Sequence, residues 1–177
     1  MSAERPRRVA VIGTSGSGKS LFAGALATRL GVPHVELDAL FWLPDWQAPD
    51  LDAFRAKVEA ATSGEGWVVD GNYSKVRDLV FGRIDTVVWL DLPLRTCLRR
   101  VVVRTLDRAR RRELLWGTNR EGLRSLVGRD SLVWWVLTTH RRRRRQNAAL
   151  FADPAFAHLR RLRYTANADA ERWLRST

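Results

Sequence analysis

Short apolar runs alternate along the chain with longer segments of helical periodicity. Five runs have the length of buried strands, namely Arg8–Ile12, His34–Leu37, Trp67–Asp70, Thr86–Leu90 and Leu159–Tyr164. Between and after them, apolar residues recur every three or four positions in Ser20–Leu30, Asp50–Ala61, Pro93–Arg112, Ser131–Leu150 and Asn167–Leu174. Strands that alternate with helices predict an α/β fold, in which a parallel sheet is flanked by its helical crossovers.

Length and composition describe one globular domain spanning residues 1–177. The 177 residues are 45% hydrophobic and 28% charged, which is typical of a chain with a single buried core. Cys97 is the only cysteine, so an intrachain disulfide is impossible and a reducing compartment is indicated. The longest apolar run, Leu132–Leu137, is far shorter than the roughly 20 residues that span a bilayer. We therefore expect a cytoplasmic protein without a membrane partner.

The net charge of +12 is concentrated in one part of the sequence. Between Arg95 and Arg145 there are 16 arginines and four acidic residues, whereas the rest of the chain has 15 basic and 15 acidic residues. Arginine favours planar, bidentate contacts to phosphate or carboxylate. The run Arg141–Arg145 is interpreted as the solvated end of a helix, with contact to nucleic acid as the alternative.

The segment that joins the first strand to the first helix matches the phosphate-binding pattern G-x-x-x-x-G-K-[ST] in full. Its residues are Gly13, Thr14, Ser15, Gly16, Ser17, Gly18, Lys19 and Ser20. Glycines let successive backbone N–H groups turn toward phosphate oxygens, and the helix that follows adds its N-terminal dipole. Lys19 is expected to reach the β- and γ-phosphates, and the Ser20 hydroxyl to bind Mg²⁺. The motif predicts binding of a nucleoside triphosphate, with ATP and Mg²⁺ as the expected ligands.

Three aspartates follow predicted strands, at the edge of a parallel sheet where ligands bind. Asp70 is the candidate magnesium ligand beside Ser20, because Gly71 lets the chain turn away directly after it. Asp38 is open between a catalytic role and a structural cap. Asp91 precedes Pro93 and is interpreted as a cap of the arginine-rich helix. His34 is interpreted as a residue of strand or loop packing without a functional role.

Several motifs together resemble the adenylate-kinase-like P-loop kinases, and in particular a bacterial group described as adenylate kinase-like or DNA topology modulation proteins. The motifs that carry the resemblance are Gly13–Ser20, Glu36–Trp42, Asp70–Tyr73, Trp89–Pro93 and Gly117–Glu121. The resemblance implies a three-layer P-loop fold with a five-stranded parallel sheet of order 2-3-1-4-5. It also implies an arginine-rich lid at about residues 104–128, in a region whose sequence from Arg112 to Gly128 predicts an irregular, mobile excursion.

The resemblance assigns roles to residues at both ends of the site. It places Asp70 at the magnesium ion, and it gives the lid arginines, which are Arg104, Arg108, Arg112 and Arg120, the task of closing on the transferring phosphoryl group. Monophosphate kinases continue the Asp-Gly pair with Phe-Pro-Arg, whereas this chain continues with Asn72–Arg77. Arg77 is then the substitute for the arginine that grips the acceptor. A hydroxyl acceptor would need a base, and Asp38 is the candidate.

The sequence as a whole predicts an ATP-dependent phosphotransferase that acts on a nucleotide or a small hydroxylated metabolite. Two other functions stay open at this point. One is an ATP-binding protein or ATPase that associates with nucleic acid through Arg95–Arg145. The other is a regulatory switch that binds nucleotide with little turnover.

Overall fold

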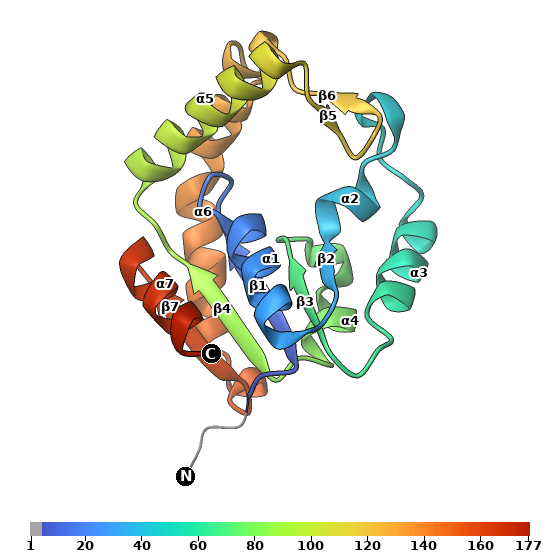
Figure 1. The fold of residues 1–177 in the computed structure, drawn as a ribbon, viewed down its shortest axis with the longest axis vertical. Coiled ribbons are helices and arrows are strands. Elements are labelled where there is room, and N and C mark those ends of the chain that lie inside the picture. The colour runs from blue at the N-terminus through green and yellow to red at the C-terminus, as the bar shows by residue number, and fades with distance from the viewer. Residues whose placement is uncertain (1–4) are drawn as a thin grey trace.

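The central feature of the computed structural model, which describes residues 5–177 apart from the side chain of Arg124, is a parallel sheet (Figure 1). Its five strands lie in the order β2-β3-β1-β4-β7, which confirms the predicted order because the strands labelled β5 and β6 form a separate hairpin. The strand bounds are β1 Arg8–Gly13, β2 His34–Glu36, β3 Trp67–Asp70, β4 Thr86–Leu90, β5 Leu114–Leu115, β6 Asn119–Arg120 and β7 Arg160–Tyr164.

Helices cover both faces of the sheet and complete three layers (Figure 1). Their bounds are α1 Lys19–Leu30, α2 Leu37–Phe41, α3 Leu51–Ala61, α4 Arg77–Phe81, α5 Leu94–Arg111, α6 Leu132–Ala152 and α7 Asn167–Ser176. Short 3₁₀ turns are η1 Pro44–Trp46, η2 Ser74–Val76, η3 Leu123–Leu126 and η4 Pro154–Phe156. Within the described chain, no helix combines the length and apolarity that crossing a membrane requires.

Alternation along β1 explains how one strand serves both layers. Val9 and Val11 pack in the cluster that contains α1 and α7, whereas Ala10 and Ile12 pack with α3, α4 and α6. All four are buried, as expected of a central strand in a parallel sheet that has helices on both faces. The strand therefore ends at a fixed point inside the molecule, and the phosphate-loop sequence starts there.

The predicted helices and sheet strands agree with the structure to within one or two residues at most ends, but short elements were missed. The helices α2 and α4 have five residues each, too few to show a periodic pattern. The prediction of an irregular Arg112–Gly128 segment was wrong in part, since this segment contains the antiparallel β5–β6 hairpin and the turn η3. The hairpin bridges from the end of α5 to the side of α2 and η1 (Figure 1).

The arginine run does not end a helix, contrary to the interpretation from sequence. Helix α6 continues to Ala152, so Arg141–Arg145 lies in its middle. The buried residues Val136, His140, Asn147 and Leu150 form a stripe along α6, and Arg143 falls on the same face. One arginine of the run is thereby turned toward the sheet.

Asp91 is a structural anchor at the end of β4, and it does not cap α5. The N-cap residue of α5 is Pro93. The carboxylate of Asp91 instead lies 3.0 Å from Nε of Arg144 and 2.6 Å from Nη2 of Arg163, and its side chain is almost fully buried. The guanidinium of Arg163 also lies 4.5 Å from the ring centroid of Trp89. This triad joins β4, α6 and β7.

Removal of this carboxylate is expected to weaken the fold. Asp91→Ala should lower the free energy of unfolding by about 2 to 3 kcal/mol, because it leaves two guanidinium groups without their buried counter-charge. The exposed Asp169–Arg172 pair supplies a matched control, and Asp169→Ala should cost less than about 0.5 kcal/mol. Urea titration measures both, and equal small losses would contradict a structural role for Asp91.

Candidate functional site

The phosphate-loop sequence leaves β1 at Gly13 and enters α1 at Lys19, as the motif requires. Gly16 has φ of +81°, and a Cβ at that position would lie 2.3 Å from the carbonyl oxygen of Cys97 in α5, so glycine is needed for both conformation and space. Gly18, the N-cap residue of α1, has no side chain to cap the helix. The N–H groups of the first turn are therefore available to an anion.

Lys19 supplies the positive charge of this loop. Its ammonium Nζ lies 3.4 Å from the carbonyl oxygen of Thr14. Burial lowers the pKa of Lys19, and the nearby carboxylates of Asp70 and Asp38 act in the opposite direction. Ser20 follows at an exposed position in the first turn of α1. The loop thus presents backbone donors, one cation and one hydroxyl at the carboxyl end of β1.

Asp70 ends β3 beside the loop, in register with Val11 of β1. Its side chain is 2% exposed, and its Oδ2 lies 3.2 Å from Nε2 of His34. This hydrogen bond is the main cause of a raised pKa for His34. The interpretation of His34 as incidental was wrong, because its ring holds one oxygen of the candidate magnesium ligand.

The residues at this edge fit a magnesium ion that is bound mainly through water and phosphate. Among residues 5–177, no group of three His, Cys, Asp or Glu side chains is arranged to hold a metal. Mg²⁺ usually retains several waters and takes one or two protein ligands in addition to substrate phosphates. Ser20 and the second oxygen of Asp70 are the candidates for those ligands.

Asp38, in the first turn of α2, is oriented by Tyr73. The Tyr73 hydroxyl donates a hydrogen bond of 2.5 Å to Oδ1 of Asp38. Burial and the charge of Asp38 raise the pKa of Tyr73, so the phenol stays neutral and keeps donating. The charge of Asp38 also acts on Lys19, Arg104 and Arg143. A carboxylate of fixed orientation therefore lies among three cations beside the phosphate loop.

The two first arginines of the predicted lid differ in their surroundings. Arg104 is close enough to Lys19 and Asp38 to affect the pKa of Lys19 and to be affected by Asp38, and burial lowers its own pKa. Arg108 instead binds Oε2 of Glu121 through Nη1 at 2.7 Å. Glu121 is 6% exposed and also accepts a hydrogen bond from the Thr105 hydroxyl. Arg104 also lies near this carboxylate, with its Nη2 3.9 Å from Oε1 of Glu121, and Arg108 secures the segment that follows α5.

The other two predicted lid arginines lie away from this group. Arg112 follows α5 with φ of +49°, and Arg120 is exposed on β6. Both line a surface hollow together with Glu113 and Glu121, and that hollow includes neither Lys19 nor Asp38. Asp70, Asp38 and Arg104 thus all act on the pKa of Lys19, whereas Arg112 and Arg120 line the surface hollow.

The β5–β6 hairpin packs against the turn η1 and is joined to it by hydrogen bonds. The Asn119 side chain accepts a hydrogen bond of 2.9 Å from the backbone N–H of Trp46 and donates one of 3.0 Å to the carbonyl of Leu43. The Trp46 indole donates to the carbonyl of Arg120, and its ring packs edge-on against Trp116. The hairpin is held by hydrogen bonds between side chains and backbone groups that are distant in sequence. A local sequence pattern does not predict such bonds.

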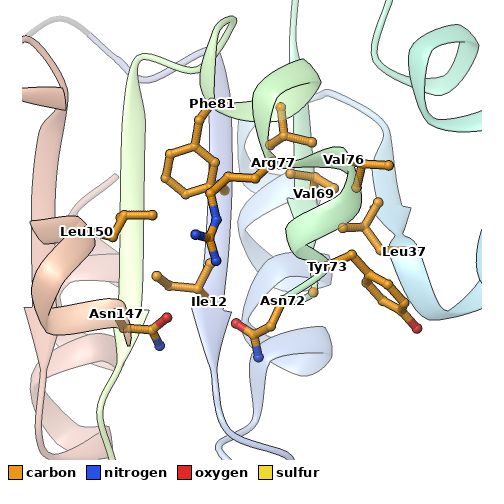
Figure 2. A pocket seen from close by; sticks show the side chains of 13 residues that line it. Ile12, Leu37, Val69, Asn72, Tyr73, Val76, Arg77, Phe81, Asn147 and Leu150 are labelled. Atoms are coloured by element: carbon orange, nitrogen blue, oxygen red, sulfur yellow. The ribbon is translucent and has the colours of Figure 1, made fainter. Parts of the chain in front are cut away.

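A cavity of about 20 Å³, large enough for one water molecule, lies between the sheet and the helices α4 and α6, beside the end of β3. Figure 2 shows the Arg77 guanidinium directed between Asn147 and Asn72, with Tyr73 beyond. Arg77 and Arg143 are near enough for the charge of Arg77 to lower the pKa of Arg143. Arg143 therefore lies within the electrostatic influence of Arg77, and its Nη1 binds the carbonyl of Asn72.

Sequence reasoning missed Asn72, Tyr73 and Arg143. Arg143 was recoverable, since it lies three residues after the buried His140 and four before the buried Asn147 on α6. Asn72 and Tyr73 belong to the Asp70–Tyr73 motif, but the motif gives them no role, because their contacts to Gly13 and Asp38 depend on where β3 ends relative to its neighbours. The backbone carbonyl of Asn72 accepts a hydrogen bond of 2.8 Å from Arg143, which links these residues.

The chain shares its overall fold with solved structures named as kinases. Similar solved structures include a shikimate kinase from Bacteroides thetaiotaomicron, with 14% identity, 97% of this chain and 96% of that chain covered, and a TM-score of 0.56. A gluconokinase from Sinorhizobium meliloti has 19% identity, coverage of 96% and 89%, and a TM-score of 0.53. A sugar kinase from Janibacter has 17% identity, coverage of 97% and 92%, and a TM-score of 0.53. Neither a family model nor a curated protein matches the sequence.

The His34–Asp70 contact predicts a pH dependence of stability. The folded chain raises the pKa of His34 above its ordinary value of 6.5, so the stabilisation is fully present below about pH 6.5 and is lost as pH rises through the folded value. His34 is partly exposed and solvent screens the pair, so the contribution is less than about 1 kcal/mol.

His34→Gln should therefore lose its disadvantage relative to the natural chain as pH rises from about 5.5 to about 8.5. Urea unfolding at a series of pH values measures this, and the exposed His158→Gln is the control. Parallel curves for His34→Gln and the natural chain would contradict the predicted coupling.

Proposed function

We propose that the chain is an ATP-dependent phosphotransferase that transfers the γ-phosphoryl group to a hydroxyl of a small metabolite. The observation that carries the proposal is the arrangement around Asp38, whose carboxylate is oriented by Tyr73 within the electrostatic reach of Lys19 and Arg104. A phosphate loop alone indicates nucleotide binding. A carboxylate that Tyr73 orients and that acts on the pKa of Lys19 adds a group that can accept the proton of an attacking hydroxyl.

Each residue of the group has a place in the proposed reaction. The loop from Gly13 to Ser20 cradles the triphosphate, with Lys19 at the β- and γ-phosphates. Asp38 accepts the proton while the acceptor oxygen forms a bond to the γ-phosphorus, and the bond from that phosphorus to the bridging oxygen breaks to release ADP. Arg104 would stabilise the charge on the transferring group.

Magnesium has a supporting role in this proposal. Bound by the phosphates, it would neutralise charge on their oxygens. Ser20 and Asp70 would hold it, with His34 keeping Asp70 in place. The β5–β6 hairpin and its flanking residues are then the lid. Arg108 acts in the lid through Glu121, and Arg112 and Arg120 would have to move to reach the phosphoryl group.

The acceptor is proposed to be a small hydroxylated metabolite that carries a negative charge. Arg77 lines a cavity with Tyr73 and acts on the pKa of Arg143, which binds the backbone carbonyl of Asn72 through Nη1. A pair of like charges at a half-buried position favours an anion between them. The similar solved structures are kinases named for shikimate, gluconate and sugar, which are small hydroxylated molecules. The adenylate-kinase-like motifs also favour phosphoryl transfer, but the sequence after Asp70-Gly71 departs from monophosphate kinases at the position of the arginine that grips the acceptor.

The first test is acceptor-dependent formation of ADP. With ATP, magnesium and a panel of hydroxylated carboxylates, sugars and nucleoside monophosphates, one acceptor should raise ADP formation strongly. Lys19→Ala should lower the rate at least about 100-fold, because the loop loses its cation. Lys57→Ala, which alters an exposed lysine of α3, is the control. ADP formation that ignores every acceptor, or that survives in Lys19→Ala, would refute the proposal.

The second test separates a hydroxyl from a phosphate acceptor. Asp38→Asn should lower kcat by about 100-fold to 10,000-fold if the acceptor is a hydroxyl that needs a base, with little change in nucleotide affinity. A phosphate acceptor needs no base, so Asp38→Asn would then have little effect on kcat. Asp52→Asn on the exposed side of α3 is the control. Steady-state kinetics with the acceptor found in the first test decide between them.

Nucleic-acid association is the second candidate. Arg141, Arg142 and Arg145 are exposed along α6, whereas Arg143 and Arg144 are engaged with Asn72 and Asp91. A gel shift with DNA or RNA that falls steeply with salt would favour this function.

A further inference from the structure

The side chain of Asn72 binds both backbone polar groups of Gly13, the first residue of the phosphate loop. The N–H of Gly13 donates to Oδ1 of Asn72 at 3.3 Å, and Nδ2 of Asn72 donates to the carbonyl oxygen of Gly13. A carboxamide is suited to this pairing, because it has a donor and an acceptor side by side. The two residues are 59 positions apart in the sequence.

This contact continues the hydrogen-bond ladder between β1 and β3 one step beyond the point where backbone pairing ends. The pairing of β1 with β3 ends at Val11 and Asp70, and the N–H of Gly71 donates the last ladder bond, of 3.3 Å, to the carbonyl of Val11. Along a strand, every second residue directs its N–H and C=O to the same neighbour, so Gly13 faces the side on which β3 has ended. The amide of Asn72 takes the place of the missing peptide group.

The conformation of Gly13 that Asn72 holds is one that only glycine can readily adopt. Gly13 has φ of +154°, and a Cβ there would lie 2.6 Å from Oγ of Ser17 and 2.7 Å from the carbonyl oxygen of Leu90. Ser17 Oγ is itself buried without a hydrogen-bond partner among the described residues. The entrance of the loop is thus confined by Leu90 on one side and Ser17 on the other, and Asn72 supplies the polar contacts on the third.

The backbone of Asn72 is held from the opposite side of the site. Nη1 of Arg143 donates to the Asn72 carbonyl at 2.8 Å, and the Arg143 guanidinium lies in the electrostatic field of Asp38 and Tyr73. One residue therefore contacts the phosphate loop through its side chain and the proposed acceptor side through its backbone. Figure 2 shows Asn72 and Tyr73 next to each other at the edge of the cavity.

We propose that Asn72 is a positioning residue that fixes the entrance of the phosphate loop and so sets its affinity for nucleotide. Arg143 supports this role by holding the Asn72 backbone. The inference rests on the proposed nucleotide site and needs no phosphoryl transfer, so a binding measurement tests it even if no acceptor is found.

The test is the dissociation constant for ADP, measured by calorimetry on the full chain with magnesium. Asn72→Ala should weaken binding about tenfold, because Gly13 loses both of its polar contacts on that side. Asn147→Ala is the matched control. Asn147 is a buried asparagine that lines the same cavity from α6 and makes no hydrogen bond to the phosphate loop in the described residues, so its loss should change the constant less than about twofold.

Thermal unfolding of the two variants separates positioning from stability. Comparable melting temperatures with weak ADP binding only in Asn72→Ala support the inference. Equal affinities, or losses that follow the melting temperature in both variants, overturn it. If Asn72→Ala does not fold, Asn72→Ser provides the same comparison, because its hydroxyl is too short to serve both groups of Gly13. Absence of ADP binding in the natural chain would refute the proposed function itself.

Discussion

The end of the ladder between β1 and β3 is the constraint on which the site depends. A strand that stops inside the molecule leaves backbone N–H and C=O groups that must find other partners. Here the ladder ends at Val11 and Asp70, and the amide of Asn72 serves Gly13 just beyond. The carboxylate of Asp70 projects at the same edge and is held by His34 of the neighbouring strand. The requirement to satisfy buried polar groups thus places loop, carboxylate and amide together.

Electrostatics add a second constraint, because the excess of arginine lies in the segment Arg95–Arg145, which includes most of α5, the β5–β6 hairpin and part of α6. Two buried carboxylates pair with three arginines of this segment and with Arg163. Asp91 holds two arginines at the end of β4, and Glu121 holds Arg108 and lies 3.9 Å from Arg104. Arg143 differs, since its hydrogen bond goes to a carbonyl group, which leaves its charge uncompensated by that contact. The arginines at the end of β4 are therefore neutralised by Asp91. Arg143 has no such partner in that contact, and its charge would favour an anion near Asp38.

The sequence predicted those parts of the molecule that local patterns determine. Buried strands, long amphipathic helices and the phosphate loop all leave such patterns, and the strand order followed from the resemblance to P-loop kinases. The helices α2 and α4 and the β5–β6 hairpin left none, because they are short and the hairpin is secured by Asn119 and Glu121. The partners of Asp38 and Asp70 depend on the register between strands, so sequence could nominate the two carboxylates without identifying Tyr73 or His34.

In the proposed site, backbone groups form the half that binds the phosphate donor, and side chains form the half that binds the acceptor. This difference explains how the fold could accommodate different acceptors. The donor half consists of backbone N–H groups and glycines whose replacement would collide with neighbouring backbone, as at Gly16. The proposed acceptor half would consist of side chains on α2, α6 and the segment after β3, which can change without moving the sheet. Kinases named for different small molecules share this fold at 14% to 19% identity. Asn72 belongs to both halves, and a change there would disturb the donor half together with the acceptor half.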